Sequence, residues 1–136
     1  MNDARNEQPV AAVGLVCLRG DQVLLIRRGA PPLEGDWSLP GGRIRWGEPA
    51  GDAALRELWE ETGCKADIIG LIDVVDGLWP DHHYVLIDYV ARWRSGEPRA
   101  GDDARDARFF SIAELPALWS ETRRVIDAAR RMVDGI

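Results

Sequence analysis

The chain has 136 residues, of which 46% are hydrophobic, and its formal net charge is −6. This length and composition suit one domain with one hydrophobic core and argue against wholesale disorder. The acidic balance argues against broad binding to nucleic acid or to an anionic membrane, and no stretch approaches the roughly 18 apolar residues of a membrane span.

Residues 1–8 are polar and lack the apolar core of a signal peptide, so the sequence predicts a disordered N-terminal tail. A single domain is then expected over residues 9–136, in a cytoplasmic protein. Two runs of mostly apolar residues follow, at 10–18 and 22–28. We expect them to form two strands joined by a tight turn at 19–21.

The clearest helical signal covers residues 49–62. Pro49 suits the first position of a helix, and Gly63 suits the position just beyond its end. Two longer apolar runs, 67–75 and 83–92, then predict two strands, with a turn-rich loop between them.

The C-terminal part of the chain is expected to hold one more strand and one more helix. Residues 107–111 are predicted as a short strand, and Ser111 followed by Glu114 is a capping pattern for a helical turn. Residues 121–133 place their apolar side chains on one helical face. This order of elements predicts an α/β (α+β) fold, in which a mixed sheet is sandwiched between helices as an α/β/α sandwich.

Three glutamates crowd the segment RELWEETGC of the central helix. At 100° per residue, Glu57, Glu60 and Glu61 fall on one face about 100° wide. Leu58 and Trp59 fall on the opposite face, where we expect them to pack in a core. A solvated acidic face is one interpretation of the glutamates. Like charges at i and i+4 destabilise a helix, however, and three convergent carboxylates suit a hard cation such as Mg²⁺.

The segment GRIRWGEPAGDAALRELWEETGC, residues 42–64, resembles the Nudix box. The positions that match this family pattern are Gly42, Glu48, Arg56, Glu57, Leu58, Glu60, Glu61 and Gly63. The last apolar position of the pattern holds Cys64, where a larger aliphatic residue is usual. The strand with Arg27 and Arg28, the segment WSLPGG and the segment FFSIAELP also look like this family, so the resemblance covers residues 10 to 134.

The resemblance implies the Nudix fold and a hydrolase that cleaves the pyrophosphate bond of a nucleoside diphosphate linked to another moiety, by water attack at phosphorus. It also implies a Mg²⁺ or Mn²⁺ cofactor. The ligands that the resemblance assigns to this cation are Glu57, Glu60, Glu61 and the Gly41 carbonyl. Glu48 and Arg56 would orient these ligands, as neighbouring groups do at many metal sites.

The resemblance leaves the general base open. Glu57 is one candidate, and the loop AGDDARDARFF offers Asp102, Asp103 and Asp106. Counted back from the segment FFSI, Asp103 best matches an extra acidic metal ligand of mutator-type relatives, so it is favoured as a further catalytic residue. A solvated acidic loop is the alternative.

Substrate contacts are expected from the second strand and from the glycine pair. Arg27 ends that strand near the expected site, while Arg28 points to the other face by strand alternation. Gly41 and Gly42 allow the backbone to approach a ligand closely. Tryptophans that could stack on a base are Trp37, which is favoured, Trp46 and Trp79.

The expected partner is a small phosphorylated molecule, either a nucleoside triphosphate or a nucleotide sugar such as ADP-ribose. The chain is near the compact size of triphosphate-cleaving relatives, which slightly favours a nucleotide. The alternative is a non-catalytic nucleotide-binding module, although such modules usually lack one or more of the glutamates. RNA decapping needs a more basic surface. A homodimer is expected only because relatives often form one.

Overall fold

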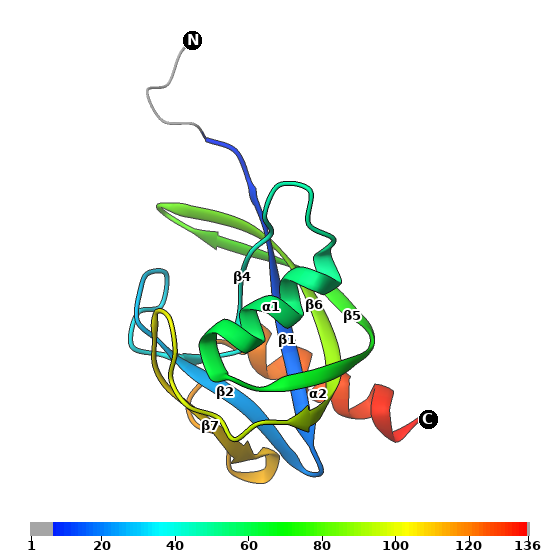
Figure 1. The fold of residues 1–136 in the computed structure, drawn as a ribbon. Coiled ribbons are helices and arrows are strands. Elements are labelled where there is room, and N and C mark those ends of the chain that lie inside the picture. Colours follow the sequence, from blue (N-terminus) through cyan, green and yellow to red (C-terminus); the bar gives the residue numbers. More distant parts are fainter. Residues whose placement is uncertain (1–6, 136) are drawn as a thin grey trace.

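The computed structural model describes residues 7–135, so most of the predicted tail, residues 1–6, lies outside the described part. Residues 7–9 have no regular secondary structure. The elements in chain order are β1 (Val10–Arg19), β2 (Gln22–Arg28), β3 (Trp37–Ser38), β4 (Gly41–Arg43), α1 (Ala50–Thr62), β5 (Lys65–Trp79), β6 (His82–Ser95), β7 (Ala104–Ser111), the 3-10 helix η1 (Ile112–Glu114) and α2 (Ser120–Asp134) (Figure 1).

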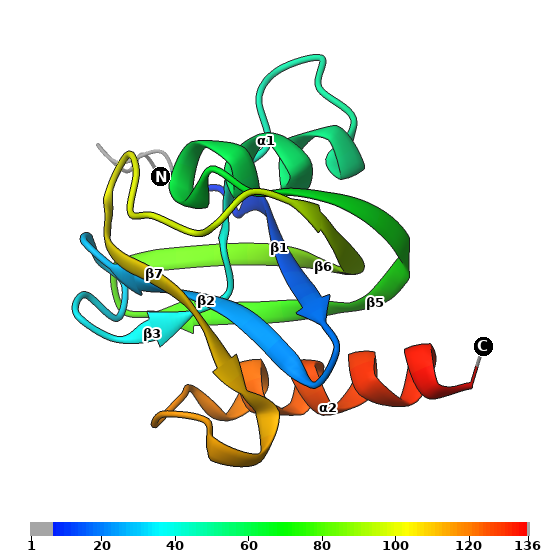
Figure 2. The ribbon, with the colours of Figure 1, turned by 60° about the horizontal axis from the view of Figure 1, so that its bottom comes forward.

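The strands form one mixed sheet with β1 near its centre. The strand order is β3-β2-β1-β6-β5, with β4 paired to β1 and β7 paired to β2. Only β1 and β6 run parallel among the described pairs, and the others are antiparallel. Figure 2 shows α1 on one face of the sheet and α2 on the other. The predicted mixed sheet between helices is therefore confirmed.

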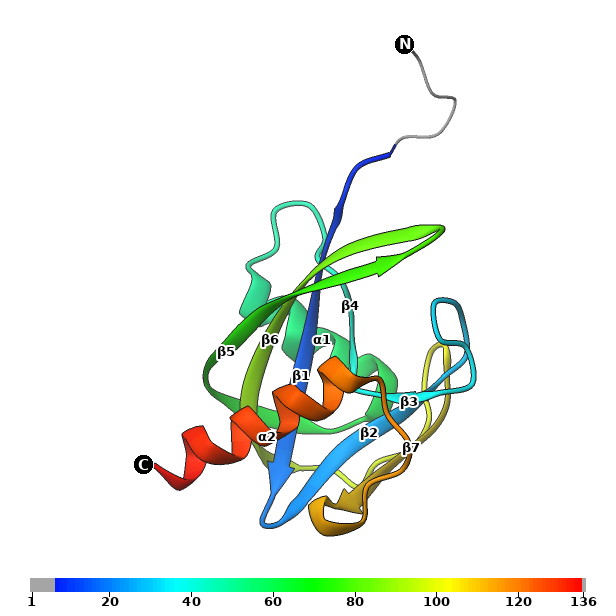
Figure 3. The same ribbon diagram turned by 180° about the vertical axis from the view of Figure 1, so that it is seen from behind.

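The core lies on both faces of β1, which explains why residues 10–18 read as a nearly continuous apolar run. Leu15 and Cys17 pack on the α1 side with Leu58, whereas Val16 and Leu18 pack on the α2 side. This division follows the two-residue period of a strand. Figure 3 shows α2 lying across the second face. Within residues 7–135, no helix is both long and apolar enough to cross a membrane.

The hairpin of β5 and β6 differs from the sequence prediction. The expected loop between them is replaced by a short turn, because the strands stay paired as far as Trp79 and His82. The Trp79 ring packs against Trp119 and Tyr84, with ring centroids 5.0 Å and 6.4 Å apart. This aromatic packing holds in strand conformation a segment whose residues favour a turn.

The predicted helix boundaries hold to within one residue for α1. Pro49 is the residue that precedes the helix, and Gly63 ends it in the left-handed region at φ 72°. The prediction that Trp59 packs in the core is wrong, because half of its surface is exposed. It stands 100° around the helix from Leu58, at the rim of the apolar face. After β7, Ser111 forms no side-chain cap, and only one 3-10 turn follows.

Candidate active site

A cavity of about 470 Å³ opens where β2 and β4 diverge from the same edge of β1. Pairing of β1 with β4 involves residues 12–14, whereas its pairing with β2 begins at Leu18. Between these two stretches the Leu15 amide donates to the Pro40 carbonyl at 3.0 Å. The cavity runs from carboxylates of α1 at one end to aromatic side chains near the start of α2 at the other.

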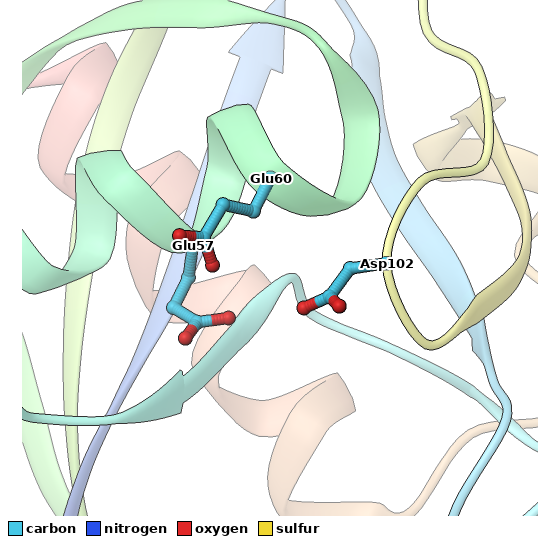
Figure 4. Close-up of side chains that lie close together, drawn as sticks. All are labelled: Glu57, Glu60 and Asp102. Atoms are coloured by element: carbon cyan, nitrogen blue, oxygen red, sulfur yellow. The ribbon is translucent and has the colours of Figure 1, made fainter.

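Three carboxylates meet beside the α1 end of this cavity, and two of them, Glu57 and Asp102, line it. Glu57 and Glu60 of α1 and Asp102 of the loop before β7 each place one oxygen within 4.8 Å of the others (Figure 4). The loop is held against the end of α1, because the amides of Arg99 and Gly101 donate to helix carbonyls at 3.0 Å. This docking brings Asp102 to the two glutamates.

Glu61 lines the same cavity but lies outside this cluster. Its Oε1 accepts a hydrogen bond of 2.8 Å from the Gly41 amide, and its side chain is buried. Burial raises the pKa of the Glu61 carboxyl to about 8. Gly41 therefore contacts a predicted ligand through its N–H, while the predicted contact of its carbonyl with a cation stays a prediction.

Arg56 connects the carboxylates of α1 with Glu48. Its Nε and Nη2 donate to the two oxygens of Glu48 at 2.7 Å and 2.9 Å. Its Nη1 donates to Glu57 at 2.8 Å and to Glu60 at 3.2 Å. The hydrogen bonds from Arg56 lower the pKa of Glu48 to about 2. One guanidinium thus orients three carboxylates and offsets part of their mutual repulsion.

Gly42 leaves the room that Glu57 needs. A Cβ at this position would lie 2.6 Å from the Glu57 carboxyl carbon and 2.7–2.8 Å from its oxygens, closer than such atoms approach. The pair Gly41–Gly42 lies in β4, beside β1, so the backbone of this strand forms one wall at the carboxylate end.

The donor set fits a hard divalent cation. All the side-chain atoms that converge are carboxylate oxygens, the ligand type that Mg²⁺ and Mn²⁺ prefer. Among the described residues, the acid that joins Glu57 and Glu60 is Asp102 and not the favoured Asp103. Asp103 does line the cavity. Asp106 lies away from it and pairs with Arg108 at 2.7 Å.

The structure reverses the expected roles of the two arginines of β2. Arg28 lines the cavity, as Ile26 does, and its guanidinium donates to the carbonyls of Pro31 and Pro32 in the loop that follows β2. Arg27 lies on the other side, where its Nε donates to the Gly35 carbonyl at 2.9 Å. The sequence shows that the two arginines alternate, but it does not show which side of β2 faces the site.

Of the three candidate tryptophans, two line the cavity and one does not. Trp37 lines the cavity and packs edge-on against Phe110, with ring centroids 4.9 Å apart. Trp79 lines the aromatic end of the cavity. Trp46 is fully exposed in the loop before α1 and does not line the cavity.

The sequence interpretation missed two carboxyls that line the cavity, those of Asp88 and Glu121. Asp88 lies in β6, is 5% exposed, and lines the cavity. Burial raises its pKa from 3.8 to about 7. The sequence does contain a signal for Asp88, because it is the only charged residue in the apolar run YVLIDYVA.

Comparisons with known proteins agree with this geometry. The profile of the NUDIX domain matches residues 8–129. The ADP-ribose pyrophosphatase of Methanocaldococcus jannaschii is 34% identical over 131 residues, which cover 93% of this chain and 76% of that protein. The 8-oxo-dGTP diphosphatase of Escherichia coli is 32% identical over 108 residues, covering 78% and 82%. A MutT NUDIX hydrolase structure from Burkholderia pseudomallei has a TM-score of 0.82 at 35% identity, covering 90% and 98%.

Proposed function

Because the chain belongs to the Nudix family of hydrolases, we propose that it cleaves the pyrophosphate bond of a nucleoside diphosphate linked to another group, with Mg²⁺ or Mn²⁺. The observation that carries this proposal is the convergence of Glu57, Glu60 and Asp102 at one end of a cavity large enough for a nucleotide.

Glu57, Glu60 and Asp102 would hold the cation, with Glu61 beside them. When bound, the cation supplies positive charge to the phosphate oxygens and makes a water molecule more acidic. Arg56 keeps Glu57 and Glu60 in place, and Glu48 fixes Arg56 in turn. The protein's own contribution is therefore to hold several carboxylates together at positions that a phosphate can reach.

Arg28 replaces Arg27 as the proposed phosphate contact, because it is the one that lines the cavity. A guanidinium can offer two parallel N–H donors to a phosphate. For the proton of the attacking water, Asp103 is the favoured acceptor. It lines the cavity outside the three-carboxylate cluster, whereas Glu57 is bonded to Arg56.

Two substrate classes remain in the proposal. One relative is named an ADP-ribose pyrophosphatase and another an 8-oxo-dGTP diphosphatase, which supports a nucleotide sugar and a nucleoside triphosphate respectively. The competing hypothesis, a module that binds nucleotide without turnover, is disfavoured because every glutamate of the predicted motif is present. The homodimer and the cytoplasmic location stay predictions.

A substrate panel tests the proposal. The purified protein is incubated with Mg²⁺ and nucleoside triphosphates, 8-oxo-dGTP, ADP-ribose or nucleotide sugars, and phosphate release is read after a coupled phosphatase. We expect turnover of at least one class, which excess chelator abolishes. Glu60→Gln should lower kcat by roughly 10²-fold, whereas the exposed Glu97→Gln should not change it.

The possible results are distinct. Binding without turnover across the whole panel would support the non-catalytic module instead. Full turnover in excess chelator would contradict the role of a cation. Wild-type turnover by Glu60→Gln would contradict the assignment of the carboxylate cluster.

A further inference from the structure

The buried carboxyl of Asp88 has no role in the proposed hydrolysis. Within residues 7–135, no side chain or backbone group pairs with Asp88, which is only 5% exposed and whose oxygens keep a small contact with the open space of the cavity. A buried carboxyl without a partner is costly, and such groups usually have a structural or ligand-binding reason. Asp88 lines the cavity, so a bound molecule could supply the missing donors.

The backbone of β1 leaves space for this carboxyl. Gly14 pairs with Asp88 in the β1–β6 ladder, and a Cβ at Gly14 would lie 2.4 Å from the Asp88 Oδ1. Any larger residue at position 14 would push the carboxyl away. The neighbouring strand position of Gly14 is Gly41, whose amide bonds to Glu61. Asp88 and the carboxylate end are thus linked through adjacent strands of one sheet.

The charged groups near Asp88 do not neutralise it. Asp73 on β5 and Glu121 on α2 add negative charge, and Arg124 adds positive charge. Arg124, however, is engaged with those two carboxylates, at 3.0 Å to Asp73 and 2.8 Å to Glu121. These two carboxylates compensate most of the charge of Arg124, so Arg124 does little to neutralise Asp88.

Besides Trp37, three aromatic side chains line the same cavity. Trp79 comes from β5, Tyr84 from β6 and Trp119 from the segment before α2. The Trp79 ring lies 5.0 Å from that of Trp119 and 6.4 Å from that of Tyr84, measured between centroids. Such a corner offers stacking and edge contacts to a flat aromatic ligand. A flat ligand that also carries N–H donors would meet both the aromatic corner and Asp88.

We infer that Asp88 is the specificity-determining contact for the nucleobase of the substrate, and that its carboxylate selects guanine over uracil. This inference rests on the proposed hydrolase function. Guanine offers two adjacent N–H donors to a carboxylate. Adenine and cytosine place an acceptor ring nitrogen beside their amino N–H, and this nitrogen repels a carboxylate. Uracil and thymine present one N–H between two carbonyls, and these carbonyls repel a carboxylate.

Selection against uracil needs the carboxylate form of Asp88, because a protonated carboxyl can donate to a uracil carbonyl and accept from the uracil N–H. Burial raises the pKa of Asp88 to about 7, so the carboxylate form predominates at pH 8.5. Asparagine at position 88 would present one hydrogen-bond donor and one acceptor in place of two acceptors. Its carbonyl accepts from the uracil N–H and its amide donates to a uracil carbonyl, so Asp88→Asn should admit uracil.

The test compares kcat/KM of the Mg²⁺-loaded enzyme for GTP, ATP, CTP and UTP, and for the corresponding nucleoside diphosphate sugars. At pH 8.5, where Asp88 is mainly a carboxylate, we expect the wild type to prefer the guanine over the uracil substrate by about tenfold or more. Asp88→Asn should raise the ratio of the uracil to the guanine substrate by about tenfold. The matched control is Asp67→Asn, which removes an exposed carboxylate of β5 that pairs with Arg94.

The outcomes separate this inference from the proposed function. If the wild type hydrolyses none of the substrates, the hydrolase proposal itself has failed. If it hydrolyses uracil and guanine substrates equally well, or if Asp88→Asn leaves their ratio unchanged, only the role of Asp88 is overturned. The wild-type comparison needs no variant, so it tests the inference even if Asp88→Asn does not fold.

Discussion

Arg56 donates two parallel hydrogen bonds to Glu48, from Nε at 2.7 Å and from Nη2 at 2.9 Å. This pair joins α1 to the loop that precedes it. The remaining guanidinium nitrogen reaches Glu57 and Glu60, so the position of two proposed ligands depends on the Arg56–Glu48 contact. Lysine keeps the positive charge but cannot form the same fork.

We therefore expect Arg56→Lys to weaken Mn²⁺ binding by about 10- to 100-fold and to lower kcat to a similar extent. Mn²⁺ affinity is measured by titration calorimetry, and kcat with the best substrate of the panel. Arg94→Lys is the control, because Arg94 forms an exposed pair with Asp67 away from the site. Unchanged Mn²⁺ affinity in Arg56→Lys would mean that the fork does not position the ligands.

A second prediction separates the two neighbouring acids of the loop before β7. Asp102 belongs to the carboxylate cluster, and its backbone adopts a positive φ of 53°, which asparagine tolerates well. Asp102→Asn should therefore keep the loop and weaken Mn²⁺ binding by about tenfold or more. Asp103→Asn should leave Mn²⁺ affinity within about threefold and lower kcat, if Asp103 accepts the proton of water.

Calorimetry and steady-state kinetics on the same two variants decide this assignment. Equal loss of Mn²⁺ affinity in both variants would show that Asp103 is also a ligand of the cation. Full activity in Asp103→Asn would show that another group of the cavity accepts the proton of the attacking water.

Local sequence patterns predict most of the fold. The strands β1 and β2 and the helix α1 follow from apolar periodicity, a proline and a glycine, all of which act within a few residues. The face shared by Glu57 and Glu60 follows from helix geometry alone. Pattern spacing also points to Glu48 and Arg56, whose contact the structure shows.

The remaining features depend on contacts between distant segments. Asp102 joins the site because its loop docks on the end of α1, through hydrogen bonds that no local pattern encodes. The side of β2 that carries Arg28 depends on where β2 lies in the sheet. The missing loop between β5 and β6 depends on the packing of Trp79 against Trp119, which lies far along the chain.

A third prediction concerns the close approach of Gly42 to Glu57. The added methyl group of Gly42→Ala would lie within 2.6–2.8 Å of the Glu57 carboxyl group, so that side chain must move. We expect Mn²⁺ affinity to fall by about tenfold or more while the far-ultraviolet spectrum stays native. Gly51→Ala is the control, since a Cβ there meets Ile68 at an ordinary 3.5 Å.

The control should raise stability slightly, by about 0.5–1 kcal/mol, because alanine favours a helix over glycine. Native Mn²⁺ affinity in Gly42→Ala would show that Glu57 can shift without loss of the site, and would weaken the case for it as a ligand.

The last prediction concerns the dependence of stability on pH. Burial raises the pKa of Asp88 from 3.8 to about 7 in the folded protein. Between these two values the folded state binds more protons than the unfolded chain, so this group lowers stability as pH rises through the window. An asparagine side chain cannot ionise, so Asp88→Asn should be free of this loss.

We therefore expect the difference in Tm between Asp88→Asn and the wild type to grow from pH 4 to pH 7 and to level off above it. Each pKa unit corresponds to about 1.4 kcal/mol, so a gain of roughly 5 °C or more is expected at pH 8. Both proteins are melted without divalent cation, so that the raised pKa of Glu61 affects them equally. A Tm difference for Asp88→Asn that is equal at pH 4.5 and pH 8 would show that this carboxyl is well solvated, and would remove the physical basis for its contact with a base.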